Sequence, residues 1–200
     1  IIFFWILWQW KNEKISGHWL WLLPLIELIW INSHVYFFMG FFILGAFGLE
    51  DLFSGRKKVI KLISVSFFSV LAALFNPFGI KGLIYPLIIF KNYGYQIVEN
   101  KSVWFLENLK IFHTSFIFFK IILIVLPLSF ILLFIFNRIK FRLSLFIVSM
   151  ALLILSGMAI RNFTLFGFFT ILALSYNLIN LSEKIKLSEL KIKTLSILLS

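Results

Sequence analysis

The chain has 200 residues, of which 62% are hydrophobic and 14% are charged, and its mean hydropathy is +1.03. Soluble domains have about 45–50% apolar and about 25% charged residues, so this composition excludes a soluble domain, a disordered chain and collagen. The absence of cysteine excludes disulfides, cysteine–zinc sites and cysteine nucleophiles. A net charge of +11 would suit nucleic acid, but the positions of the basic residues argue against that ligand. We predict an all-α, polytopic transmembrane helix bundle.

In the first half of the chain, apolar runs are broken by short polar clusters. Residues 1–10 are predicted to be the end of a span, because the chain begins inside an apolar run without an initiator methionine. As one straight helix, residues 19–49 would measure roughly 46 Å, against a hydrocarbon core of about 30 Å. Two segments that meet at 32–34 are therefore predicted. A charged loop at 50–61 and a helix-ending Asn-Pro-Phe-Gly break at 76–79 follow.

The second half is predicted to contain a short interfacial or re-entrant piece, a polar loop and three spans: 80–90, 91–110, 114–136, 143–160 and 163–181. Beyond them lies a charged segment, which ends in what resembles the start of another span. We therefore expect a single transmembrane domain over residues 1–200, cut from a longer chain and lacking N-terminal spans.

Lysine and arginine placement predicts the orientation. The loops at 50–61, 137–142 and 182–193 hold four, three and four basic residues, whereas those at 91–110 and 161–162 hold three and one. Basic loops face the cytoplasm, so we expect a multi-pass protein of the plasma (inner) membrane with the three richer loops inside. The partners expected from this pattern are the lipid bilayer and its anionic head groups, and no nucleic acid.

With this orientation, the polar breaks all fall at extracytoplasmic ends of helices. They are residues 32–34, 76–79, 99–107 and 161–162. Broken helices at membrane depth are tolerated where protein or a water-filled cavity satisfies the backbone. The predicted architecture therefore has broken or re-entrant helices near the extracytoplasmic face, around one polar cavity.

Two cationic residues lie at these breaks. His34 could be a structural histidine bonded to a carbonyl, or it could bind phosphate or relay a proton. Arg161 could extend to the interface, or its planar guanidinium could hold a lipid-linked phosphate. Glu99 and Glu107 lie in the outer loop, where a solvated face is the more ordinary interpretation. Glu27 lies inside a short span, where it must be protonated, paired or facing a cavity.

Three glycines lie in the apolar stretch 19–49. Gly40, Gly45 and Gly48 are predicted to allow close helix packing. No phosphate-binding glycine loop and no group of histidines and carboxylates at metal-ligand spacing is present, so neither a metal site nor a cofactor is identified. Dependence on a divalent metal does not follow from the sequence.

The breaks resemble motifs of a known family. Residues 30–37 resemble the W-x-N-x-H-G-G-F element of bacterial multi-span membrane proteins related to GT-C glycosyltransferases, which use polyprenyl-phosphate-linked sugars. Residues 76–79 with Tyr85-Pro86 resemble the family's N-P-Y-G…Y-P element, 161–166 its R-N/H-x-P-L-F element, and 99–105 its E-W-x-S-P-D-F stretch. The order and spacing agree over residues 20–170.

This chain also departs from those motifs. Val35 and Tyr36 replace the two glycines, Thr164 replaces the proline, and the tryptophan and aspartate of the loop element are missing or displaced. The likeness is to a divergent member.

The resemblance implies a membrane glycosyltransferase that transfers a sugar from a polyprenyl-phosphate carrier to an extracytoplasmic acceptor. GT-C enzymes usually place a catalytic carboxylate in the first extracytoplasmic loop. The single aspartate here, Asp51, falls on the cytoplasmic side, so the catalytic residues are unknown and the base is expected outside this chain. The candidate substrate-binding residues are Arg161, His34, Asn32, Asn76, Asn162 and Glu99.

Two other functions stay open. A transporter or flippase would use the same outer cavity but would also need an inner gate and internal repeats, and no convincing repeat is present. A non-catalytic scaffold subunit would use the polar breaks for packing alone.

Overall fold

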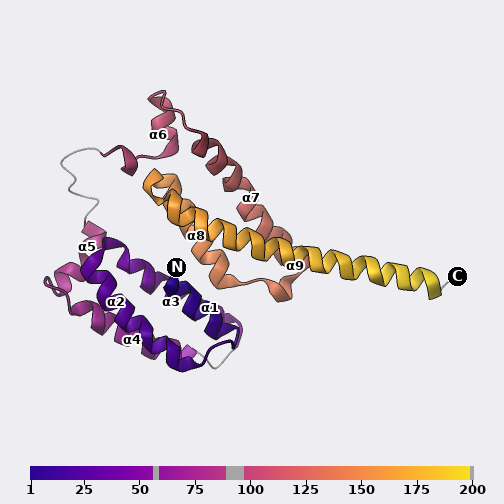
Figure 1. Cartoon of the computed structure of the whole chain (residues 1–200), viewed down its shortest axis with the longest axis horizontal. Coiled ribbons are helices and arrows are strands. Elements are labelled where there is room, and N and C mark those ends of the chain that lie inside the picture. The colour runs from indigo at the N-terminus through magenta and orange to yellow at the C-terminus, as the bar shows by residue number, and fades with distance from the viewer. Residues whose placement is uncertain (56–58, 89–96, 199–200) are drawn as a thin grey trace. The chain divides into compact units, whose positions relative to one another are not determined.

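The computed structural model describes residues 1–55, 59–88 and 97–198, with side chains described as far as Lys184 in the last helix. The described residues form helices joined by short connections and contain no strand. The predicted all-α class is therefore confirmed for this part of the chain. Two compact units make up the fold: Ile1–Gln96, here unit 1, and Ile97–Ser200, here unit 2 (Figure 1).

Unit 1 is a bundle of helices whose bounds are α1 Ile2–Lys11, η1 Gly17–Trp21, α2 Leu22–Ser33, η2 Val35–Phe37, α3 Phe38–Phe53, α4 Val59–Leu74 and α5 Ile80–Ile88. The break predicted at 32–34 is present, because α2 ends at Ser33 and His34 is extended at φ −157°. The second break lies between α4 and α5, where Gly79 takes a positive φ of 53° that favours glycine. Pro24 lies in the first turn of α2, where a missing N–H costs nothing.

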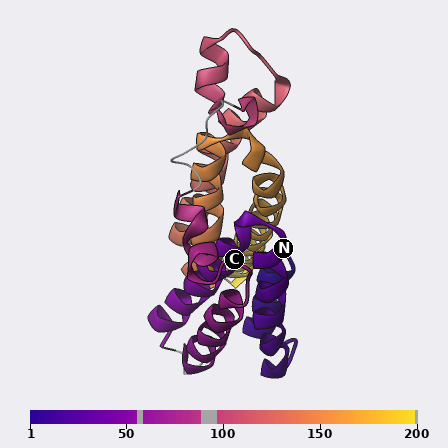
Figure 2. The same ribbon diagram turned by 90° about the vertical axis from the view of Figure 1, so that its left-hand side faces the viewer.

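The helices of unit 1 run in alternating directions. The Asn32 side chain joins the ends of α2 and α4 by donating to the Phe75 carbonyl at 3.1 Å. Lys61, near the start of α4, lies against Gly17 just before α2, so these two helices are parallel. They pack on each other, and Val65, Ser69 and Ala73 of α4 are fully buried. Helix α3 returns in the opposite direction, and Figure 2 shows these helices side by side.

Unit 1 therefore has two distinct ends. At the break end, α2 and α4 finish and α3 and α5 begin. At the opposite end, which we call the ionic end, the last residue of α1 pairs with the last turn of α3. This corrects one prediction: Glu50 and Asp51 were expected to open a charged loop, but they are buried inside α3, and residues 56–58 of that loop lie outside the described residues.

Unit 2 consists of η4 Val98–Asn100, α6 Val103–Asn108, α7 Thr114–Phe136, η5 Arg138–Lys140, α8 Leu143–Met158, η6 Ile160–Asn162 and α9 Phe163–Leu198. The span predicted at 114–136 matches α7. The predicted loop 91–110 holds two short helices, while its residues 91–96 lie outside the described ones.

A second correction concerns the C-terminal segment. The charged stretch 182–193 was expected as a separate loop, but α9 continues through it to Leu198. That stretch consists largely of glutamate, lysine, leucine and isoleucine, with neither glycine nor proline to stop a helix. The chain becomes polar after residue 181, but α9 continues as a helix through the polar stretch.

Helices α7 and α9 run in parallel and contact each other along the length of α7. Near their starts, the rings of Phe119 and Phe163 stack with centroids 5.0 Å apart. Further along, Asn177 donates to the Ser129 hydroxyl at 2.9 Å, and Asn137 donates to the Asn180 carbonyl at 3.0 Å. The basic turn at η5 therefore lies at the end of unit 2 opposite η4 and η6.

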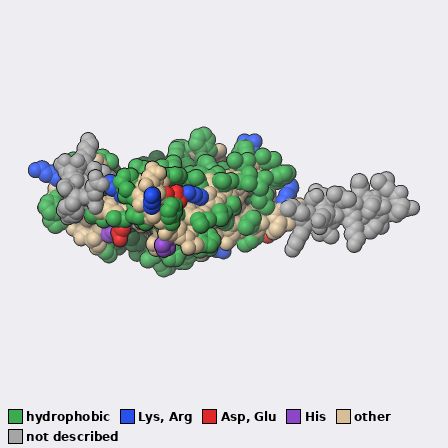
Figure 3. Space-filling model, turned by 90° about the horizontal axis from the view of Figure 1, so that it is seen from above, with side chains coloured by type: hydrophobic (Ala, Val, Ile, Leu, Met, Phe, Trp, Pro, Cys, Tyr) green, Lys and Arg blue, Asp and Glu red, His purple; other side chains and the backbone are tan. Residues whose placement is uncertain are grey.

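Within the described residues, three helical stretches are long and apolar enough to cross a membrane: Val35–Phe53, Thr114–Phe136 and Ile160–Lys184. Helices α4 and α8 are apolar but have only 16 residues each. Hydrophobic side chains cover most of the face seen in Figure 3. Such an exterior suits a lipid bilayer as the surrounding medium.

Candidate functional site

A cavity of about 570 Å³ lies at the break end of unit 1. Its walls come from the end of α2, from η2, from the turn after α4 and from the start of α5. The lining residues are Ile31, Asn32, Ser33, His34, Val35, Phe37, Asn76, Pro77, Phe78, Lys81, Gly82 and Tyr85. Three of the predicted site residues, Asn32, His34 and Asn76, are thus brought together. The volume suits a small-molecule ligand, since such sites span about 300–1,000 Å³.

The two asparagine amides at this cavity hold its backbone in shape. Asn32 donates to the carbonyls of Leu28 and Phe75, and so ties α2 to the end of α4. Asn76 donates to the carbonyls of Ala73 and Gly79, and its Oδ1 accepts from the Phe78 N–H at 2.8 Å. Every hydrogen atom and the carbonyl oxygen of the Asn76 amide are therefore used within the turn, which gives this residue a structural role.

His34 is exposed and lines the cavity. Its Nδ1 accepts a hydrogen bond from the backbone N–H of Tyr36 at 3.1 Å, and its ring stacks on the Tyr36 ring with centroids 5.2 Å apart. An accepting Nδ1 places the proton of the neutral imidazole on Nε2. The exposed His34 ring therefore presents an N–H donor at the cavity wall.

Lys81 is a cavity residue that the sequence analysis missed. It lies in the first turn of α5, is exposed, and has no ion-pair partner among the described residues. Tyr85, one turn later on the same helix, also lines the cavity. Spacing could have revealed both, because residues four apart on a helix share a face, and Lys81 follows the break directly.

The helix ends at this cavity do not select a charge by themselves. Helices α3 and α5 begin there, and their starts attract anions, while α2 and α4 end there, and their ends attract cations. Because these dipoles oppose one another, the side chains decide which ligand is favoured. The charged group lining the cavity is the Lys81 ammonium, and the imidazole adds a second donor. The cavity favours an anion.

The remaining predicted site residues lie in unit 2. The segment of Glu99 packs against that of Arg161, where the Ile160 N–H donates to the Lys101 carbonyl at 3.1 Å. Glu99 is exposed and Arg161 is partly buried. The Asn162 amide donates to the Leu155 carbonyl at 2.7 Å and so caps the end of α8. The segments that carry these three residues lie together within unit 2.

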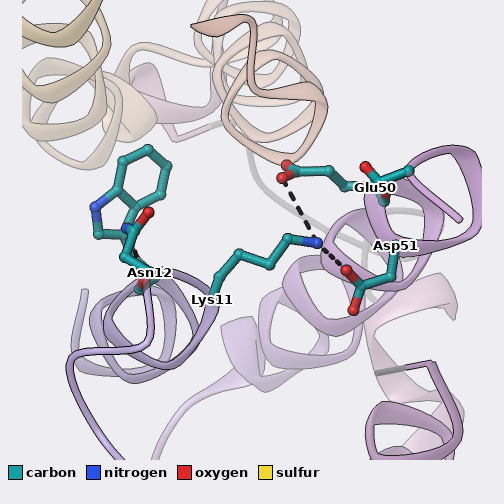
Figure 4. A network of polar contacts seen from close by, with 6 residues as sticks. Lys11, Asn12, Glu50 and Asp51 are labelled. Carbon is teal, nitrogen blue, oxygen red and sulfur yellow. Dashed lines mark hydrogen bonds and ion pairs between the residues drawn. The ribbon is translucent and has the colours of Figure 1, made fainter. Parts of the chain in front are cut away.

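The ionic end of unit 1 holds a cluster that sequence reasoning did not find. The Lys11 ammonium bonds to the Asp51 carboxylate and lies 3.6 Å from Glu50 Oε1 (Figure 4). All three side chains are almost completely buried. A buried charge is stable only when it is paired, so this cluster fixes α1 against α3. Forty residues separate Lys11 from Asp51, and no local pattern indicates the pair.

The sequence did not decide the environments of two further carboxyls, Glu107 and Glu27. Glu107 receives both its hydrogen bonds from the Lys120 ammonium, each at 2.7 Å, and so joins α6 to α7. Lys120 therefore pairs within the protein. Glu27 is fully buried in α2, and neither of its oxygens has a hydrogen-bond partner among the described residues. Among the described residues, no group of three or more histidines and carboxylates could hold a metal ion.

The fold and the site define an all-α protein with helices able to cross a membrane and a cavity at a helix break. No protein-family model matches the chain, and neither a curated protein nor a solved structure is similar to it. The resemblance to relatives of GT-C glycosyltransferases accordingly rests on the motifs at residues 30–37, 76–86, 99–105 and 161–166.

Proposed function

We propose that this chain is a membrane protein that binds the phosphate head group of a lipid-linked sugar at the break end of unit 1. The observation that carries the proposal is the cavity of about 570 Å³ in which His34 and Lys81 meet apolar walls. An ammonium and an imidazole N–H are donors that suit phosphate oxygens, and hydrogen bonds to charged groups are the stronger kind.

The apolar part of the cavity suits the lipid part of such a ligand. Ile31, Val35 and Phe78 line the same space as the two donors. An amphiphile with a charged head and an isoprenoid chain would place its head on the donors and its first carbons on these side chains. A free sugar phosphate would leave the apolar walls uncovered.

The proposed orientation follows from where basic residues lie in each unit. In unit 1 the cavity lies at the end opposite Lys61 near the start of α4, and the sequence just before that helix holds Arg56, Lys57 and Lys58. In unit 2 the basic turn 137–142 lies at the end opposite Arg161. If basic segments face the cytoplasm, both polar breaks face outward, in a multi-pass inner-membrane protein.

The activity we propose is transfer of the sugar to an extracytoplasmic acceptor. The acceptor hydroxyl oxygen would bond to the anomeric carbon while the bond from that carbon to the phosphate oxygen breaks. The hydroxyl proton would pass to a carboxylate base, and cationic groups would hold the leaving phosphate. Arg161 enters as a second phosphate-binding group through the resemblance, with Glu99 and Asn162 as its polar neighbours.

Binding is tested first, with the full chain in lipid nanodiscs and polyprenyl phosphate as the probe. Lys81→Ala should weaken binding about tenfold or more, because a hydrogen bond to a charged group contributes about 1.5–3 kcal/mol. Lys140→Ala removes the same charge from the exposed turn of unit 2 and should leave affinity unchanged.

His34 has a close control in the same chain. His113 is also exposed and also accepts a backbone N–H on Nδ1, from Ser115 at 3.2 Å, but it caps α7 in unit 2. His34→Ala should weaken binding, whereas His113→Ala loses the same kind of cap without the ligand contact. Equal affinities in both variants and in Lys81→Ala would refute the proposed site.

Transfer is tested with the full chain in lipid nanodiscs and a polyprenyl-phosphate sugar. Arg161→Ala should abolish transfer while membrane insertion is preserved. Normal transfer in that variant would refute its role. Phosphate-dependent binding without transfer would favour the flippase or the scaffold over the enzyme.

A further inference from the structure

We propose that Glu27 is a proton-binding site inside unit 1, which holds a proton while its carboxyl is buried and releases it to water that enters from the cavity side. This proposal does not depend on the ligand of the cavity. It begins from the environment of one carboxyl, which neither the resemblance nor the proposed function uses.

The carboxyl of Glu27 lies against the backbone of another helix. A Cβ added to Gly40 of α3 would collide with Glu27 Oε2 and lie 3.2 Å from Cδ, and 3.3 Å from the ring of Phe3 on α1. Glycine at position 40 therefore makes the room that the carboxyl occupies. The other glycines of this helix do not share that role, because a Cβ at Gly45 or Gly48 would meet nothing within 4 Å.

No cation neutralises Glu27 within the described residues. Its side chain is fully buried, and both oxygens lack a hydrogen-bond partner. The charged groups on the neighbouring helices lie elsewhere: Lys11, Glu50 and Asp51 pair with one another at the ionic end, and Lys61 of α4 lies against Gly17. An ionised carboxylate in such surroundings costs several kcal/mol, so the buried form carries a proton.

The cavity supplies the route for that proton. Ile31, one helical turn after Glu27 on α2, lines the cavity, and so does Phe37, one turn before Gly40 on α3. The Glu27–Gly40 contact thus lies about one turn, roughly 5 Å, below the cavity floor. The titratable side chains that line the cavity are His34, Lys81 and Tyr85, and the ring of Tyr36 in η2 stacks on that of His34.

The chemical step is simple. The carboxyl O–H bond breaks, its electron pair stays on the carboxylate oxygen, and the proton passes to a water molecule. The ionised group then leaves the Gly40 contact to reach water, because the contact offers it no donor. Proton release is in this way linked to separation of α2 from α3, and proton uptake to their close packing.

A hydrophobic carbodiimide is the probe for the test, because it reacts with protonated carboxyls in apolar surroundings. In the full chain at neutral pH it should label Glu27, with Glu50 and Asp51 left unlabelled as ion-paired internal controls. Labelling, located by peptide mass spectrometry, should fall reversibly as the pH is raised while helicity by circular dichroism is retained. Glu27→Gln should lose that label.

Two glycine variants separate proton binding from a general effect on α3. Gly40→Ala removes the space for the carboxyl and should reduce Glu27 labelling at least severalfold. Gly45→Ala makes the same change five residues later in α3, and labelling of Glu27 should stay as in the unchanged protein.

Three results would overturn the proposal: Glu27 unlabelled at every pH, labelling that persists until the helices unfold, or equal labelling in the Gly40→Ala and Gly45→Ala variants. Should Gly40→Ala fail to fold, infrared spectroscopy of the unchanged protein against Glu27→Gln decides. A protonated-carboxyl band that is absent, or that does not disappear reversibly with rising pH, refutes the site.

Discussion

The two units bury different kinds of polar side chain between their helices. Each has a polar break at one end, yet among the described residues every buried ionisable side chain lies in unit 1: Lys11, Glu27, Glu50 and Asp51. The buried polar side chains of unit 2 are all neutral serines, threonines and asparagines. Hydrogen bonds between neutral side chains cost little free energy to bury and contribute little stability, whereas a buried charge requires a partner. The buried polar side chains of unit 2 thus serve helix packing, whereas unit 1 also buries ionisable side chains.

The largest expected effect comes from removing the lysine of the ionic end. Lys11→Met leaves Asp51 and Glu50 buried without their counter-ion, and should lower the free energy of unfolding by about 3–5 kcal/mol. Detergent-titration unfolding followed by circular dichroism measures it. Lys14→Met, on the exposed turn three residues later, is the control and should stay within about 0.5 kcal/mol of the unchanged protein.

A second substitution that partly restores the stability of Lys11→Met would test whether the unpaired carboxylates cause the loss. Adding Asp51→Asn to Lys11→Met removes one of the two stranded charges and leaves that of Glu50, so it should recover part of the loss, because a buried charge without its partner is the costly state. If Lys11→Met is as stable as Lys14→Met, the contrast between the units is wrong.

The corresponding pair in unit 2 should be much weaker. A double-mutant cycle of Asn177→Leu and Ser129→Ala should give a coupling of about 0.6 kcal/mol, typical of hydrogen bonds between membrane helices. Asn177→Leu combined with Ser149→Ala, a buried serine of α8, should give no coupling. A coupling as large as the effect at Lys11 would show that unit 2 depends on its polar groups as strongly as unit 1.

The smallest effect is expected at the ion pair of unit 2. The side chains of Lys120 and Glu107 are 44% and 21% exposed, so water screens the pair and Lys120→Ala should cost at most about 0.5 kcal/mol. High salt should shrink that difference further, while the effect of Lys11→Met should persist, since buried pairs are screened less. Salt sensitivity at Lys11 instead would mean that the ionic end is open to water.

The sequence predicted the elements that depend on local physics. A mostly apolar run of 23 residues gave α7 its limits, and proline and glycine placed the break after α4. The break at His34 followed from length alone, because one straight helix would exceed the bilayer. The end of α9 was mispredicted, since a polar stretch can leave the membrane as helix.

The candidate site was predicted in part. Asn32, His34 and Asn76 do line one cavity, but the amide of Asn76 is used up in its own turn, which the spacing of N-P-F-G could have suggested. Lys81 was overlooked because a lysine after a break resembles any other basic residue of a loop. Whether Arg161 and Glu99 bind a substrate stays a prediction.

By itself, the sequence determined that this chain consists of apolar helices, where most of them begin and end, and which polar residues interrupt them. Transfer free energies and backbone geometry act residue by residue, so composition and spacing are enough for these features. Only the tertiary structure decided that Lys11 pairs with Asp51, that Glu27 lies on Gly40, and that Lys81 joins His34 at one cavity. Those contacts join different helices, and nothing in a local pattern specifies which faces of two helices will meet.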